Sequence, residues 1–137
     1  MKVEIKNRFT GSIIISGDYE SLKNCLEHNR GANLRGANLG DAYLGGANLR
    51  GAYLGDADLG GAKGYVNSHD IFQEAVRRQP VSTFNDTEWA AIAQIVIHCL
   101  CWDSIKKRFT DEMPHIFETL ANEGFTEWLE YWNSEVK

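Results

Sequence analysis

The sequence predicts a β-solenoid joined to an α-helical bundle, and three observations lead to this prediction. Alanine returns every fifth residue from Ala32 to Ala62, and leucine follows each alanine by two positions from Leu34 to Leu59. Glycine, aspartate and arginine fill the positions between one leucine and the next alanine. After Gly64 glycine becomes rare and the composition turns helix-forming and aromatic. We therefore divide the chain into a cap at 1–30, repeats at 31–64 and a helical region at 65–137.

A period of five residues fits neither a helix nor simple strand alternation, and fixed periods are typical of stacked repeats. Alanine and leucine lie two positions apart, so on an extended segment they point to one side, while the Asn, Tyr or Asp between them points away. The glycine-containing pairs let the chain bend once per repeat. If four bends close one coil, residues twenty apart stack, which would place Leu34 under Leu54 and Leu39 under Leu59.

The first 30 residues are predicted to form a hairpin and a helix that cover one end of the stack. Apolar residues alternate with polar ones as far as Phe9, Thr10 and Gly11 offer a turn, and three isoleucines follow. Asp18 can then begin a helix that runs to about His28. Such a cap is expected because a stack of repeats otherwise exposes its apolar end.

The region after Gly64 is predicted to hold four or five short helices. The first begins at Asn67 or Ser68 and ends before Pro80. The second begins at Asn85, which forms a capping pair with Glu88, and it is apolar on nearly all sides. Further helices are expected at 102–109, from about 113 to Gly124 with Pro114 in the first turn, and after Thr126.

Composition narrows the classes of function. The formal net charge is −5 and 24% of residues are charged, which disfavours direct nucleic-acid binding. No apolar run reaches the roughly 20 residues that span a bilayer, and no signal peptide is recognised, so we expect a cytoplasmic protein without a membrane partner. The three cysteines, Cys25, Cys99 and Cys101, are too few for a disulfide framework and are expected to be reduced.

The repeats resemble the pentapeptide-repeat family, whose members carry A(N/D)LXX arrays. This resemblance implies a short right-handed quadrilateral β-helix at 31–64. The chain also resembles small pentapeptide-repeat proteins of tailed phages and prophages, through VEIKNRFTG at 3–11 and HCLCWDSI at 98–105. Some long members of the family resemble duplex DNA and inhibit topoisomerases. Six full repeats with almost no net charge are too short and too weakly acidic for such mimicry.

The sequence offers little evidence for a catalytic site or a metal site. His98, Cys99 and Cys101 lack the second ligand pair of a zinc site, so no metal is expected. The glycines follow the repeat and form neither a phosphate-binding loop nor a nucleophile elbow. The sequence therefore predicts no cofactor and no enzymatic activity.

Contact residues are expected where arginine and aromatic side chains point outward. On the repeats these are Arg35, Arg50, Tyr43 and Tyr53, whose guanidinium and phenol groups suit recognition of phosphates, bases or carboxylates. A solvated face is an equal alternative. In the helical region, Trp128 and Trp132 would form part of a protein interface if they are exposed.

The leading hypothesis is a non-enzymatic, phage-encoded binding protein that inhibits a bacterial host protein, in host takeover or anti-defence. The alternative is an oligomer that sequesters a nucleotide between subunits, near Arg35, Arg50 and Tyr53. A DNA-mimicking topoisomerase inhibitor and an architectural part are further alternatives. A homodimer or larger assembly is expected under each hypothesis, because short apolar helices and an open stack end gain from symmetric pairing.

Overall fold

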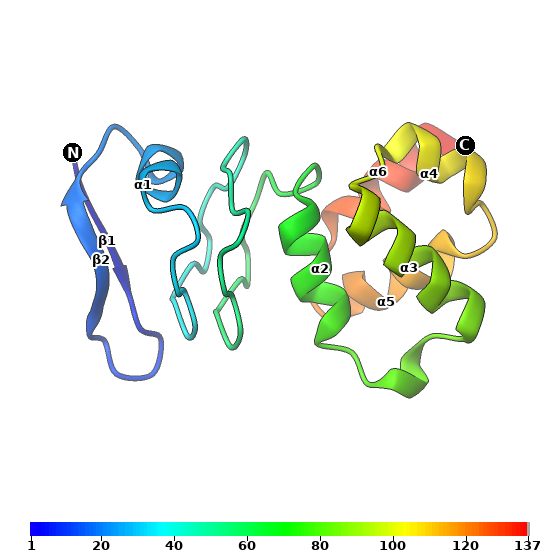
Figure 1. Ribbon diagram of the computed structural model, residues 1–137, viewed down its shortest axis with the longest axis horizontal. Coiled ribbons are helices and arrows are strands. Elements are labelled where there is room, and N and C mark those ends of the chain that lie inside the picture. The colour runs from blue at the N-terminus through cyan, green and yellow to red at the C-terminus, as the bar shows by residue number, and fades with distance from the viewer. Residues whose placement is uncertain (137) are drawn as a thin grey trace. The chain divides into compact units, whose positions relative to one another are not determined.

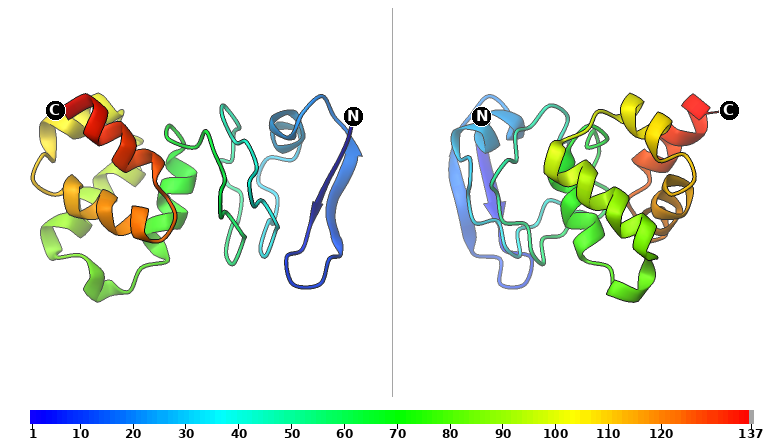
Figure 2. Two further views of the ribbon diagram at one scale, coloured as in Figure 1. Left: turned by 180° about the vertical axis from the view of Figure 1, so that it is seen from behind. Right: turned by 45° about the vertical axis from the view of Figure 1, so that its right-hand side comes forward.

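The computed structural model describes residues 1–136 and divides the chain into two compact units, Met1–Asp70 (unit 1) and Ile71–Lys137 (unit 2). Figure 1 shows the hairpin, one helix and the repeats of unit 1, and the helices of unit 2. Figure 2 shows from two further sides how the helices drawn in green to red gather into one bundle. The finer division into 1–30, 31–64 and 65–137 stays a prediction.

The predicted hairpin is confirmed. Strands β1 (Lys2–Lys6) and β2 (Ile13–Asp18) pair antiparallel, and Ile5 of β1 is almost fully buried. The loop between the strands is held by the Asn7 side chain, whose Oδ1 accepts hydrogen bonds from the backbone N–H groups of Phe9 (2.8 Å) and Thr10 (3.0 Å). Asn, with its short polar side chain, commonly closes turns in this way.

Helix α1 (Leu22–His28) begins later than expected, because Ser21 and not Asp18 supplies the cap. The Ser21 side chain accepts a hydrogen bond from the Asn24 N–H at 3.1 Å, which satisfies one of the unpaired donors of the first turn. Cys25 and Leu26 on the inner side of this helix are buried.

Each repeat folds as a four-residue turn from a leucine to the next alanine. The alanine N–H donates to the carbonyl oxygen three residues earlier, as in Ala37 to Leu34 at 3.0 Å and Ala57 to Leu54 at 3.0 Å. The third residue of each turn has φ between 58° and 78°, namely Gly36, Asp41, Gly46, Gly51, Asp56 and Gly61. This is the geometry of a type II turn, which requires a left-handed residue at that position.

Hydrogen bonds join segments of the repeats that lie about twenty residues apart in the sequence. We call these segments successive passes of the chain. Isolated parallel bridges link Asn33 with Tyr53, Asn38 with Asp58 and Tyr43 with Lys63. The leucines that follow the bridged residues point inward, and all six from Leu34 to Leu59 are at most 5% exposed. Inward leucine and outward polar residues thus agree with the alternation in the sequence.

The predicted β-solenoid, and with it the right-handed quadrilateral β-helix, is wrong. Among residues 1–136 the only strands are β1 and β2, and six α-helices make up most of the regular secondary structure. The repeats are drawn in Figure 1 as irregular chain without strands. The physical reason is length: the turn takes four residues of each five, so only one residue is left to pair and the pairing stays an isolated bridge.

Unit 2 contains the predicted short helices, with α2 starting in the last two residues of unit 1. The α-helices are α2 (His69–Arg77), α3 (Asp86–His98), α4 (Trp102–Arg108), α5 (Met113–Asn122) and α6 (Glu127–Val136), and a 3-10 helix covers Val81–Thr83. Phe72 lies at the centre of the core, where its ring meets Trp102, Phe117 and Trp128 edge-on at centroid distances of 5.6, 6.4 and 5.3 Å. Such edge-to-face contacts add to the stabilisation from buried apolar area.

The capping pair of α3 is confirmed. The Asn85 side chain accepts a hydrogen bond from the Glu88 N–H at 2.8 Å, and Glu88 Oε1 accepts one from the Asn85 N–H at 2.9 Å. The other carboxylate oxygen of Glu88 lies 2.7 Å from His115 Nδ1, so this buried side chain is fully paired.

We predict that Gly51→Ala lowers the free energy of unfolding by about 1 to 2 kcal/mol, because φ at this residue is +78° and L-residues are strained there. The added Cβ itself would make only an ordinary contact, 3.6 Å from the Gly31 Cα. Gly60→Ala is the matched control, since Gly60 has no left-handed φ and its Cβ would meet only the Asp58 side chain. Urea unfolding measures both, and equal losses would contradict the turn geometry.

Candidate functional site

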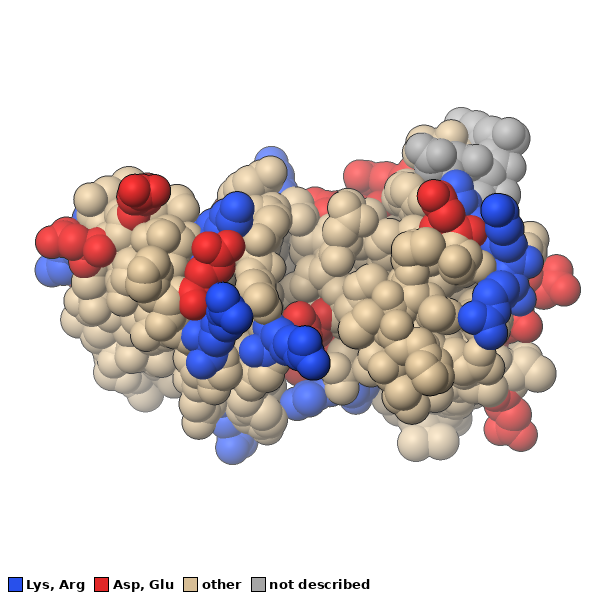
Figure 3. Space-filling model, turned by 45° about the horizontal axis from the view of Figure 1, so that its top comes forward, with Lys and Arg blue, Asp and Glu red and all other residues tan. Residues whose placement is uncertain are grey.

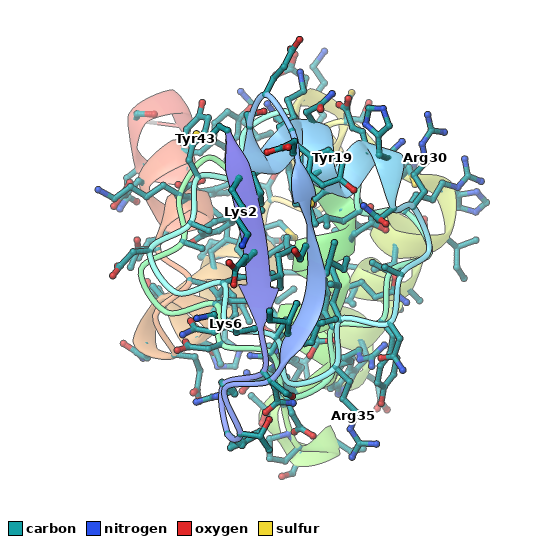
Figure 4. The ribbon with its side chains drawn as sticks, turned by 90° about the vertical axis from the view of Figure 1, so that its left-hand side faces the viewer. Lys2, Lys6, Tyr19, Arg30, Arg35 and Tyr43 are labelled. Atoms are coloured by element: carbon teal, nitrogen blue, oxygen red, sulfur yellow. The ribbon has the colours of Figure 1, made fainter. Side chains whose placement is uncertain are left out.

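Arginine and tyrosine side chains are brought together on one outward side of unit 1, here called the arginine–tyrosine face. Its centre is the bridged pair Asn33 and Tyr53. Arg30 and Arg50 lie in the turns before this pair, and Arg35 lies in the turn after Asn33. Figure 4 shows Arg30 and Arg35 pointing outward on the same side of the unit. Figure 3 shows several Lys and Arg side chains on unit 1, with Asp and Glu side chains between and beside them.

A groove of about 440 Å³ adjoins this face at the hairpin loop. Its lining residues are Asn7, Phe9, Ile14, Asn33, Arg35, Gly36 and Asp56. Phe9 is 70% exposed, and the Arg8 guanidinium lies 5.0 Å from the centroid of its ring. The loop that carries these residues is fixed to the repeats, because the Arg8 N–H donates to the Gly36 carbonyl at 2.7 Å and the Asn38 N–H donates to the Lys6 carbonyl at 2.7 Å.

The charges that line the groove are paired only loosely. Arg35 Nε lies 3.5 Å from Asp56 Oδ2, and the two side chains are 65% and 62% exposed. Arg8 Nη1 donates to the Asp56 backbone carbonyl at 3.2 Å. Exposed ion pairs contribute little to stability, so Arg35 can exchange this carboxylate for one from a partner at small cost.

The two outward tyrosines lie flat against glycines and point to different sides. A Cβ on Gly55 would come within 2.9 Å of the Tyr53 ring, and one on Gly64 would come within 2.9 Å of the Tyr43 ring. Because Gly55 and Gly64 have no side chain, the two tyrosine rings can lie against the backbone at these glycines. Tyr53 is nevertheless 44% exposed and Tyr43 is 70% exposed. Figure 4 shows Tyr43 on the side of the unit opposite Arg35, so Tyr43 lies outside the arginine–tyrosine face.

Arg50 influences a carboxyl group at the start of α2. Burial raises the pKa of the Asp70 carboxyl above its ordinary value, and the positive charges of His69 and Arg50 partly oppose this rise. Asp70 is half-buried and lies in the first turn of α2, where a negative charge is also favoured by the helix dipole.

The two tryptophans that the sequence singled out are core residues, so the condition for an interface role is not met. Trp128 is fully buried and Trp132 is 7% exposed. Trp128 packs edge-on against Phe72, and the Trp132 ring lies 5.8 Å from that of Phe117. Their large apolar surface is used inside unit 2.

Sequence reasoning missed Phe9, Arg8 and Asp56. The alternation in the sequence predicts Phe9 in the first strand, but β1 ends at Lys6 and Phe9 lies in the loop. The signal was available in Asn7, which favours a turn within the next residues. Asp56 could not be found from its own repeat, because its neighbour Arg35 is 21 positions away.

Other groups in the described residues offer little chemistry. Residues 1–136 contain no group of three or more His, Cys, Asp or Glu side chains placed to hold a metal ion. Cys25 is buried, whereas Cys99 and Cys101 are exposed, and a hydrogen bond with Ser104 lowers the pKa of the Cys101 thiol. In the same part of the chain, every helix is too short or too polar to cross a bilayer.

Comparison with known proteins agrees with the resemblance stated from the sequence. Residues 30–63 match the family model described as pentapeptide repeats, in eight copies. No curated protein and no solved structure matches the chain.

We predict that Asp70→Asn stabilises the protein relative to wild type more at pH 7 than at pH 3.5. The folded-state pKa of Asp70 lies above its unfolded value of about 3.9, so its contribution to the free energy of unfolding falls as the pH rises through that window. Urea unfolding at both pH values measures the difference. Asp18→Asn, which removes an exposed carboxylate, is the control. A wild type that gains stability relative to Asp70→Asn as the pH rises would contradict this assignment.

Proposed function

Because residues 30–63 are pentapeptide repeats, we propose that this protein is a non-enzymatic binding protein whose repeats serve as a protein-interaction module. The observation that carries the proposal is the arginine–tyrosine face with its groove. It combines Arg35, Tyr53 and the exposed Phe9, and arginine and aromatic residues are the types that dominate binding energy at protein interfaces.

The scaffold beneath this face favours binding. The backbone on both sides of Tyr53 is hydrogen-bonded to the neighbouring pass, since the Tyr53 N–H donates to the Ala32 carbonyl at 3.1 Å and the Tyr53 carbonyl accepts from the Leu34 N–H at 2.8 Å. A face that is ordered before binding loses less conformational entropy when a partner docks. Of the four arginines Arg8, Arg30, Arg35 and Arg50, Arg35 has a carboxylate partner in Asp56 and Arg50 interacts with the half-buried Asp70. A face with these exposed arginines favours an acidic partner surface and argues against mimicry of DNA.

The finer form of the proposal is a phage-encoded protein that acts in the bacterial cytoplasm by binding and inhibiting a host protein. Its support is the resemblance of residues 3–11 and 98–105 to small phage and prophage proteins. Self-association into a homodimer belongs to the same proposal. An inhibitor of this kind works by occupying a surface, so it needs no catalytic group of its own.

We predict that one dominant protein is captured from bacterial lysate by the tagged wild-type chain and is lost when Arg35 and Tyr53 are replaced together by alanine. Two such residues at an interface centre contribute about 2 kcal/mol each, so the affinity should fall by a factor of several hundred or more. Capture is measured by quantitative mass spectrometry, and the affinity with the purified partner.

Tyr43→Ala is the matched control, because Tyr43 occupies the same repeat position and lies on the opposite side of unit 1. It should retain the partner at the wild-type level. Equal retention by the Arg35→Ala/Tyr53→Ala variant, or loss only in Tyr43→Ala, would contradict the assignment of the arginine–tyrosine face.

A further inference from the structure

Arg30 and Arg50 occupy the same position in two stacked turns. The turns are closed by the Ala32 N–H, which donates to the Asn29 carbonyl at 3.1 Å, and by the Ala52 N–H, which donates to the Leu49 carbonyl at 3.0 Å. Their backbones are in contact, because a Cβ built on Gly51 would lie 3.6 Å from the Gly31 Cα. The two arginines therefore lie on neighbouring passes of the chain. Hydrogen-bonded neighbouring backbones are about 4.8 Å apart.

This arrangement places two positively charged residues on neighbouring passes, and Asp70 offsets part of the charge of Arg50 alone. Like charges directly opposite each other on paired backbones are destabilising. Both arginines are exposed. The nearby carboxyl group is Asp70, which is half-buried and feels the charge of Arg50. An anion from outside would remove the repulsion between the two guanidinium groups.

The two turns that carry Arg30 and Arg50 form a corner of unit 1, here called the Arg30–Arg50 corner, which is also open to a ligand. Each arginine is followed by a glycine with left-handed φ, Gly31 at +73° and Gly51 at +78°. These glycines are exposed and have no side chain to cover the space beside the guanidinium groups. Figure 4 shows Arg30 extending away from the unit into solvent.

We propose that the Arg30–Arg50 corner binds the phosphoryl group of a phosphomonoester. A phosphate dianion has three acceptor oxygens and about two negative charges at neutral pH, which match two guanidinium groups that each donate in pairs. A carboxylate has one charge and two oxygens, and it would leave one arginine unneutralised. The phosphoryl group can come from a free nucleotide or from a phosphorylated protein side chain, and the site does not depend on the partner proposed above.

The test is calorimetric titration of the purified full chain with phenyl phosphate, with acetate as the singly charged comparison. Phenyl phosphate should bind saturably and at least tenfold more tightly than acetate. Arg30→Gln and Arg50→Gln should each weaken phenyl phosphate at least tenfold, while Lys63→Gln, which removes an exposed charge elsewhere on the repeats, should leave it unchanged. Circular dichroism checks that the four proteins are equally folded.

Two further ligands distinguish the source of the phosphate. Adenosine monophosphate represents a free nucleotide, and a phosphoserine peptide represents a modified protein; whichever binds more tightly identifies the source. The proposal is overturned if phenyl phosphate binds no better than acetate, or if its affinity is the same in wild type, Arg30→Gln and Arg50→Gln. Loss of binding in Lys63→Gln to the same degree would also overturn it, because the attraction would then come from net charge alone.

Discussion

The left-handed residue at the third position of each repeat turn is the constraint on which unit 1 depends. Gly36, Asp41, Gly46, Gly51, Asp56 and Gly61 all hold φ between 58° and 78°, and each allows the following alanine to bond back to the preceding leucine. The turn directs the leucine side chain into the interior. The one residue between two turns is then free to form a bridge with the next pass of the chain. The five-residue period, the buried leucines and the outward positions therefore follow from one backbone requirement.

The candidate site is a consequence of those outward positions. A residue between two turns, such as Tyr53, faces solvent on a backbone that is hydrogen-bonded on both sides. A residue at the second position of a turn, such as Arg35, extends from a corner. The scaffold thus decides where side chains point, and the sequence at these positions decides their chemistry. Arginine at three corners, Arg30, Arg35 and Arg50, places positive charge on one side of unit 1 within a chain whose formal net charge is −5.

Local signals in the sequence predicted much of the fold. The hairpin, the Asn85–Glu88 capping pair and Pro114 in the first turn of α5 are all observed, since each depends on a few neighbouring residues. The β-solenoid was wrong because period and polarity alone do not reveal that a turn consumes four residues of five. The sequence left the exposure of Trp128 open and placed Phe9 in a strand, because burial depends on distant residues, and Asp56 reaches Arg35 only through the stacking of two passes.

Hydrogen exchange of single backbone amides tests this account most directly. The N–H groups of Tyr53, Asp58 and Lys63 donate to the carbonyls of Ala32, Ala37 and Ala42 in the neighbouring pass. The N–H groups of Arg35, Gly40 and Gly60 donate only to exposed side chains two residues away. The account predicts that the first set exchanges much more slowly than the second. Equal exchange rates in the two sets would show that the neighbouring passes are not joined by hydrogen bonds. The turns would then not form the scaffold described here.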